Sequence, residues 1–151
     1  MRSGMKLIYA AILGFVLTGK SYAVAEVRYG ITFGPVLNWS FGETGNKFFY
    51  GANIAYWDFR GGIPWSIGFG YEGSNSFENL IYSELQSGAW LYGASAGAVY
   101  SNKHGFGGQA SVWGNFFGGL NLRTRYLNKG FHFVPGLYLS IPVMKIDGNF
   151  G

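Results

Sequence analysis

Residues 27–41 read VRYGITFGPVLNWSF, and large apolar side chains occupy every second position of this stretch. The residues between them are small or polar, with Val36 as the exception. Successive side chains of a β-strand point to opposite faces, so this strict period of two predicts a half-buried strand. At about 3.3 Å per residue it is longer than the usual strand of about five or six residues. The apolar set is Val27, Tyr29, Ile31, Phe33, Pro35, Leu37, Trp39 and Phe41.

The same alternation recurs along the chain and predicts an all-β protein of about eight strands. Residues 106–127 keep one phase for 22 residues. A single strand of that length would measure about 70 Å, so we expect a turn near Phe117 that divides it. A change of phase after residue 85 predicts a tight turn at Ser87-Gly88. The later strands are expected over 47–59, 63–72, 79–87, 89–101, 106–116, 120–127 and 130–145.

Residues 1–25 differ from the rest of the chain and predict a cleaved secretory signal peptide. Two basic residues precede an apolar run at 7–17, and small residues close the segment, with cleavage expected after Ala23 or Ala25. The alternative is a membrane-anchoring helix, but this run is shorter than the roughly 20 residues that a spanning helix needs. The expected division is a signal peptide at 1–25, a β-barrel domain at 26–145 and a short tail at 146–151.

Charge and composition narrow the class of protein. Three of the eleven basic residues and none of the seven acidic ones fall in the expected signal peptide, which leaves a net charge of +1 on the remaining chain. That balance gives no reason to expect a nucleic-acid partner. Charged residues make up 12% of the chain and aromatic residues 20%, whereas about a quarter of a typical soluble domain is charged. The absence of cysteine excludes a disulfide framework.

The chain resembles the small bacterial outer-membrane β-barrel proteins in its signal peptide, its alternating strands, its aromatic residues near strand ends and its aromatic closing strand. Residues 136–141, GLYLSI, resemble the closing-strand assembly signal of that class. The resemblance implies a closed, antiparallel, up-and-down transmembrane barrel in the outer membrane. Its expected partners are outer-membrane lipids and the outer-membrane assembly machinery. A sheet that spans a membrane must close, because lipid cannot satisfy free backbone groups.

The expected connections alternate in length. Loops of about five to seven residues are expected near Phe41, Gly73 and Ser101, and tight turns near Arg60, Ser87 and Phe117. Long loops at one end and short turns at the other are typical of outer-membrane barrels.

The expected closing seam, where the first and last strands pair, contains Pro35 and Pro135. Proline cannot donate a hydrogen bond to the ladder, so we expect these two positions to mark bulges.

One concentrated polar set lies on the inner face by parity. We interpret it as a structural network that neutralises buried charge in the lumen, because a desolvated charge needs a partner. An ion path or gate is the alternative. The set comprises Glu84, Gln86, Asn121, Arg123 and Arg125.

Aromatic residues are expected in two places. Those on the apolar face near strand ends should lie at the membrane interface, namely Trp39, Trp65, Trp90, Tyr71 and Tyr126. Trp57 and Trp113 fall on the inner face, so we expect them to pack in the lumen.

The two histidines, His104 and His132, have Ser101 and Ser140 as conceivable partners for catalysis. No spacing links them into a nucleophile and base, so we expect solvated loop histidines and neither a metal nor another cofactor. The leading interpretation is a non-catalytic outer-membrane barrel with a structural or surface-interaction role; the sequence does not identify its surface partner. The alternatives are a secreted soluble lipid-binding barrel, with its apolar face inward, and a membrane lipid-modifying enzyme.

Overall fold

The computed structural model describes residues 29–43, 45–60, 63–89, 91–115, 117–128 and 130–146. The expected signal peptide at 1–25 lies outside the described residues, as do Trp90 and all but the first residue of the expected tail. Within the described part, no helix has the length and apolar character that crossing a bilayer requires.

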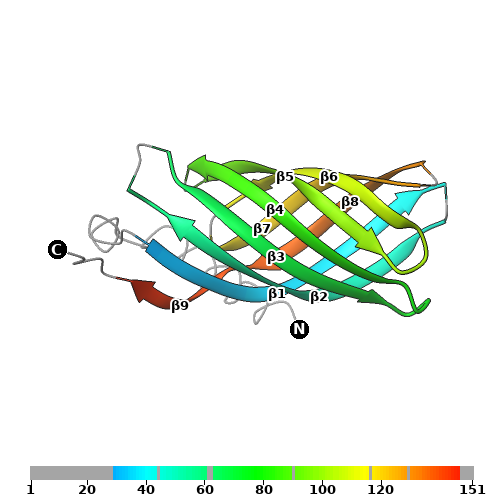
Figure 1. Ribbon diagram of the computed structural model, residues 1–151, viewed down its shortest axis with the longest axis horizontal. Helices are drawn as coiled ribbons and strands as arrows, with labels where there is room; N and C mark the ends of the chain where they lie inside the picture. Colours follow the sequence, from blue (N-terminus) through cyan, green and yellow to red (C-terminus); the bar gives the residue numbers. More distant parts are fainter. Residues whose placement is uncertain are drawn as a thin grey trace, which may run out of the picture.

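The described chain forms an antiparallel sheet that closes on itself into a barrel (Figure 1). Each strand from β1 to β7 pairs with the next, and β1 also pairs with β8 and β9. β8 and β9 are two parts of one strand along β1, interrupted at Ser140, so eight strands surround the interior. The predicted fold class is confirmed. The elements are β1 Tyr29–Gly42, β2 Lys47–Asp58, β3 Trp65–Ser74, β4 Asn79–Ala89, β5 Tyr92–Ser101, β6 Gly105–Gly114, β7 Gly118–Leu127, β8 Gly130–Leu139 and β9 Ile141–Ile146.

We call the two ends of the barrel distal and proximal. The distal end holds the β1–β2, β3–β4, β5–β6 and β7–β8 connections; at the proximal end β1 begins and β9 finishes (Figure 1). The connections contain two to four residues at the distal end and two to six at the proximal end, so the predicted asymmetry of loop length is wrong. Pairing continues almost to each distal turn, as at Ser40↔Lys47 and Ser101↔Gly105. The strands extend beyond the residues that alternate clearly, because each further pair of residues satisfies backbone hydrogen-bonding groups. The connections are therefore shorter than predicted.

The tight turn predicted at Ser87-Gly88 is also wrong. Both residues belong to β4 and pair with residues of β5; β4 continues to Ala89, and β5 begins at Tyr92. The change of phase is nevertheless present, because buried side chains are even-numbered in β4 and odd-numbered in β5. The turn predicted near Phe117 lies between the end of β6 at Gly114 and the start of β7 at Gly118, as the constant phase of 106–127 required.

The bulges predicted at Pro35 and Pro135 are wrong as well. β1 pairs with β9 up to Phe33 and resumes with β8 from Val36 in the same register, so the ladder skips Pro35 without a shift. The residue of β1 that faces Pro135 is likewise unpaired with β8. A missing N–H removes a ladder bond without requiring an extra residue. The register shift lies instead between the third and fourth residues of β1, opposite β9.

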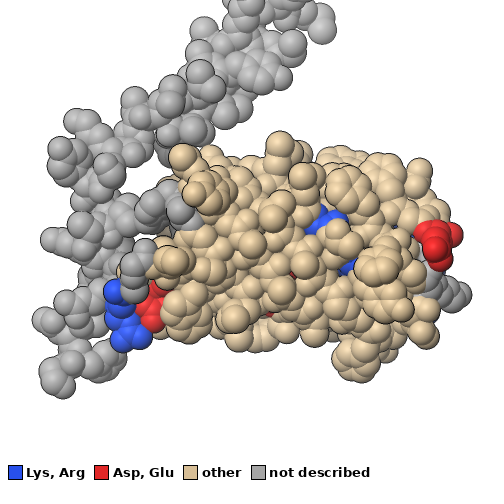
Figure 2. Space-filling model, turned by 90° about the horizontal axis from the view of Figure 1, so that it is seen from above, with Lys and Arg blue, Asp and Glu red and all other residues tan. Residues whose placement is uncertain are grey.

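The two faces of the barrel wall differ in chemistry. Outward positions carry exposed apolar side chains on every strand from β1 to β9. Figure 2 shows one such face, largely uncharged, with most of the charged side chains at its two ends. Inward positions hold a core that combines ten apolar residues with a larger set of buried polar and charged ones.

Glycines on the inner face make room for large neighbours. A Cβ atom on Gly93 would lie 2.1 Å from the ring of Trp113, and one on Gly70 would lie 2.1 Å from the ring of Tyr82. These separations are far below van der Waals contact, so glycine is required at both positions for the aromatic rings to fill the lumen.

Candidate functional site

Six polar side chains meet inside the barrel and form what we call the central network. They come from β1, β3, β4, β6 and β7, and each lies at an inward position of its strand. None is more than 5% exposed. The members are Asn38, Glu72, Glu84, Gln109, Arg123 and Arg125.

Glu72 lies at the centre of this network. Its carboxylate accepts hydrogen bonds from Arg123 Nη1 at 3.0 Å and from Arg125 Nη2 at 3.3 Å. Asn38 Nδ2 donates a third bond at 2.9 Å. Burying an ionised carboxylate costs free energy unless the group is paired and hydrogen-bonded. The three donors therefore stabilise Glu72 in the barrel interior.

Glu84 supplies the second carboxylate. Its Oε1 lies 3.2 Å from Arg123 Nη2 and accepts a hydrogen bond from Gln109 Nε2 at 2.7 Å. Gln109 Oε1 in turn accepts a bond from Arg125 Nε at 2.9 Å. Two carboxylates therefore face two guanidinium groups, and the formal charge of the network is zero.

The structure places the predicted polar set as follows. Glu84, Arg123 and Arg125 lie in the central network, but Arg125 pairs with Glu72 rather than with Glu84. Asn121 is buried and Gln86 is partly buried. These two side chains line a cavity of about 40 Å³ together with Glu84 and Arg123.

Glu72 lies outside the polar set predicted from the sequence. Two signals point to it. The first is parity, which puts Glu72 on the inner face of its strand with Ser66. The second is charge: Glu84 alone cannot neutralise both Arg123 and Arg125, which also lie on the inner face by parity. The need to pair buried charges would have called for a second acid among the inward positions.

Apolar layers close the lumen on both sides of the central network. On the distal side the buried cluster contains Phe49, Leu80, Tyr82, Val99 and Leu127. On the proximal side Trp57 and Trp113 pack edge to face, with ring centroids 6.1 Å apart. The inward orientation predicted for both tryptophans is confirmed.

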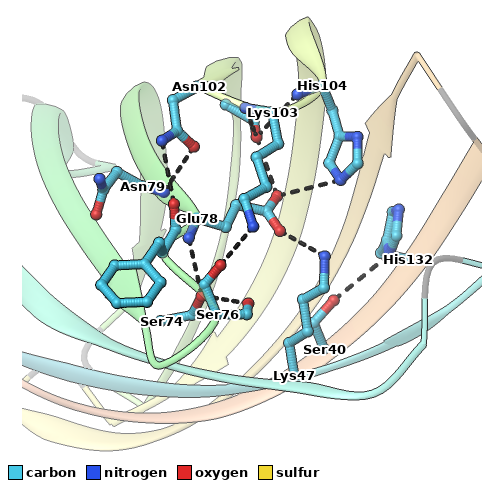
Figure 3. A network of polar contacts seen from close by, with 12 residues as sticks. Ser40, Lys47, Ser74, Ser76, Glu78, Asn79, Asn102, Lys103, His104 and His132 are labelled. Atoms are coloured by element: carbon cyan, nitrogen blue, oxygen red, sulfur yellow. Dashed lines mark hydrogen bonds and ion pairs between the residues drawn. The ribbon is translucent and has the colours of Figure 1, made fainter.

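A second polar group, which we call the distal cluster, lies beyond the distal apolar layer (Figure 3). Its centre is Glu78, whose Oε2 accepts a hydrogen bond from Lys47 Nζ at 2.6 Å and whose Oε1 accepts one from Ser101 Oγ at 3.0 Å. His104 Nε2 lies 3.5 Å from Glu78 Oε1. The remaining members are Ser40 and His132, joined by a contact of 3.5 Å between Oγ and Nδ1.

This arrangement corrects the expectation that the histidines are solvated. His132 is 3% exposed, and the side chain of His104 is 8% exposed. His132 lies at an inward position of β8, and His104 in the β5–β6 connection lies against Glu78, so both imidazoles are inside the barrel end. Sequence spacing could not show this, because Glu78, His104 and His132 come from three different hairpins.

The environment of Glu78 shifts its protonation. Burial alone raises the pKa of its carboxyl group. The hydrogen bonds from Lys47 and Ser101 and the positive charge of Lys47 outweigh burial, and they hold the pKa below its ordinary value of 4.5. The carboxylate therefore stays ionised at neutral pH.

Four of the five predicted interface aromatics lie on the outer face. Trp39, Tyr71 and Tyr126 are exposed near the distal ends of their strands, and Trp65 is exposed at the proximal start of β3. Their contact with lipid remains a prediction. The fifth, Trp90, lies outside the described residues.

Neither polar group has the arrangement of a metal centre. Among the described residues, no three His, Cys, Asp or Glu side chains are grouped so that they could hold a metal ion. In the distal cluster the Lys47 ammonium occupies the side of Glu78 that a cation would need.

Comparison with known proteins bears on the fold alone. No family model and no curated protein matches the chain. Among solved structures, the solution NMR structure of the de novo designed protein TMB2.3 is similar at a TM-score of 0.50 and 15% identity, over 77% of this chain and 96% of that one. A structure titled "De novo design of transmembrane beta-barrels" has a TM-score of 0.47 and 11% identity, over 73% and 95%. With the apolar outer face, the chain has the fold of an eight-stranded transmembrane β-barrel.

Proposed function

We propose that this protein is an integral β-barrel of the bacterial outer membrane, with a structural or surface-interaction role and no catalytic activity. The observation that carries the proposal is the distribution of polarity across the wall. Apolar side chains cover the outside, whereas the ion pairs of the central network lie inside. A barrel dissolved in water would have its apolar side chains inside and its polar side chains outside, because the burial of apolar surface drives folding in water.

The height of the outer apolar face supports a membrane location. On β1 the outward apolar residues run from Ile31 to Phe41, ten residue steps. This is about 33 Å along the strand, and at a tilt of about 40° it projects to about 25 Å. The apolar band of outer-membrane barrels has about that height.

The filled lumen argues against the soluble lipid-binding alternative. The interior cavity beside Arg123 has a volume of about 40 Å³, whereas sites for small organic ligands usually measure about 300 to 1,000 Å³. A lipid chain would have to displace the central network or the tryptophan pair, so the lumen does not favour such a ligand.

The lipid-modifying alternative lacks an accessible nucleophile at the distal cluster. Ser40, Ser101 and both histidines are buried in the barrel end, and Ser101 Oγ is engaged with Glu78. The cavity between Glu78, His132 and Arg125 has a volume of only about 10 Å³. A substrate would have no room beside these side chains, so we keep the non-catalytic role.

Detergent dependence tests the proposal. The chain without residues 1–25 is expected to fold into a monomeric β-sheet protein in detergent micelles or phospholipid vesicles, and to aggregate when both are withheld. Circular dichroism and sedimentation measure both states. A monomeric, folded protein at high concentration without detergent or lipid would contradict the membrane assignment.

The filled lumen also predicts the electrical behaviour. Eight strands enclose a space that side chains can fill, and here the central network and both apolar layers fill it. Planar-bilayer recordings of the reconstituted protein are therefore expected to show no stable steps of porin size. Large and stable steps would mean that the lumen is open.

A further inference from the structure

The distal cluster connects parts of the barrel that no turn connects. Glu78 lies in the β3–β4 connection, Lys47 begins β2, Ser101 ends β5 and His104 lies in the β5–β6 connection. His132 adds β8, and its partner Ser40 adds β1 (Figure 3). The contacts of Glu78 therefore join four of these elements, and the Ser40–His132 contact joins the other two beside the same small cavity.

The imidazoles in this cluster are incompletely hydrogen-bonded. His104 Nδ1 and Nε2 and His132 Nε2 are buried atoms without a hydrogen-bond partner among the described residues. Buried polar atoms normally have partners, and exceptions call for an explanation. A switch between two protonation states would explain them, since imidazole gains a charge and a second donor near pH 6.5.

We propose that the distal cluster is an acid-sensitive clasp, which holds the distal turns together at neutral pH and loosens when both imidazoles are protonated. The inference rests on the barrel fold and is independent of the membrane in which the barrel resides. At neutral pH the Lys47 ammonium and the Glu78 carboxylate balance each other.

Protonation upsets this balance. The charged groups that surround the two imidazoles are Lys47 from β2, Glu78 from the β3–β4 connection and Arg125 from β7. Arg125 is already paired with Glu72, so Glu78 alone would face Lys47 and two imidazolium groups. Buried, uncompensated charge is costly, and proton uptake then favours a state in which the imidazoles reach water. Glu43 and Lys103 are exposed at the rim and do not relieve this excess.

Two backbone hydrogen bonds report on the clasp. The amide of Asn102 donates to the carbonyl of Asn79 at 3.1 Å, and the amide of Ser74 donates to the carbonyl of Glu78 at 2.9 Å. The proximal end offers matched references, in which the amides of Asn115 and Ser140 donate at 2.9 Å to the carbonyls of Leu91 and Phe117, which lie in proximal connections.

Amide hydrogen exchange by NMR in detergent micelles tests the proposal. Protection factors, corrected for the intrinsic effect of pH, are expected to fall at the distal amides between about pH 7.5 and 5.5, by up to about tenfold for each imidazole that takes up a proton on opening. The proximal amides are expected to keep their protection. Titration of the imidazole Cε1 resonances in the same samples should show a folded-state midpoint at the low-pH end of the range over which distal protection is lost.

Variants identify the groups responsible. In a His104→Gln, His132→Gln double variant the distal protection factors should no longer depend on pH in this range. If the double variant does not fold, each single variant should reduce the pH dependence, and the imidazole titration of the unaltered protein remains available.

Three results would overturn the clasp. These are unchanged distal protection at pH 5.5, an equal loss at both ends, and a loss that persists in the double variant. Glu78 predicts a separate step, because its lowered pKa stabilises the folded state above pH 4.5 and this contribution disappears as the pH falls through the folded-state value. A transition confined to pH values below about 4.5 would therefore assign the effect to Glu78 and not to the imidazoles.

Discussion

Replacing Glu72 with glutamine is expected to destabilise the barrel by about 3 to 5 kcal/mol, the usual cost of breaking a buried ion pair from one side. Glu72 is fully buried and accepts hydrogen bonds from both Arg123 and Arg125. Without its charge, Glu84 alone faces two buried guanidinium groups. Urea unfolding in phospholipid vesicles, followed by tryptophan fluorescence, measures the change in the free energy of unfolding.

A matched control is available on the surface. Glu43 lies in the β1–β2 connection and is exposed, so Glu43→Gln should change the free energy of unfolding by no more than about 0.5 kcal/mol. A loss below 1 kcal/mol in Glu72→Gln would show that the central network tolerates unpaired charge, as a hydrated lumen would. It would also reopen the ion path as an interpretation of the inward charges.

The second large effect is expected on the outer face. Ile67 is exposed on β3 between the outward residues Trp65 and Tyr71. An Ile67→Arg change would place a charge in lipid, which costs about 2 to 4 kcal/mol near the bilayer midplane. The same unfolding measurement in vesicles gives the value.

Gly68→Ser, at the next position along β3, serves as its control. A Cβ atom there would lie 3.0 Å from the flexible end of Gln86, inside the barrel. A small polar group at that place should cost much less than Arg at Ile67. Similar costs for the two variants would argue that lipid does not surround the outer face.

The sequence by itself determined the fold class and the two faces of the wall. Alternation in residues 29–41 predicted which side chains of β1 face outward, and the constant phase of 106–127 required a turn that preserves parity. The low charge content predicted an apolar exterior. These properties are local, because the side of a strand on which a residue lies depends only on the period of two.

The tertiary structure decided which inward residues meet. Glu72 forms ion pairs with Arg123 and Arg125, and His104 lies against Glu78 inside the distal end. It also decided that the distal connections are short and that Pro35 interrupts the seam without shifting it. The parity of a residue predicts whether its side chain faces inward or outward, but it does not predict the height of that side chain along the barrel axis. Height depends on the stagger of all the strands around the closed sheet and on the turns that set their register, and no single stretch of sequence contains that information.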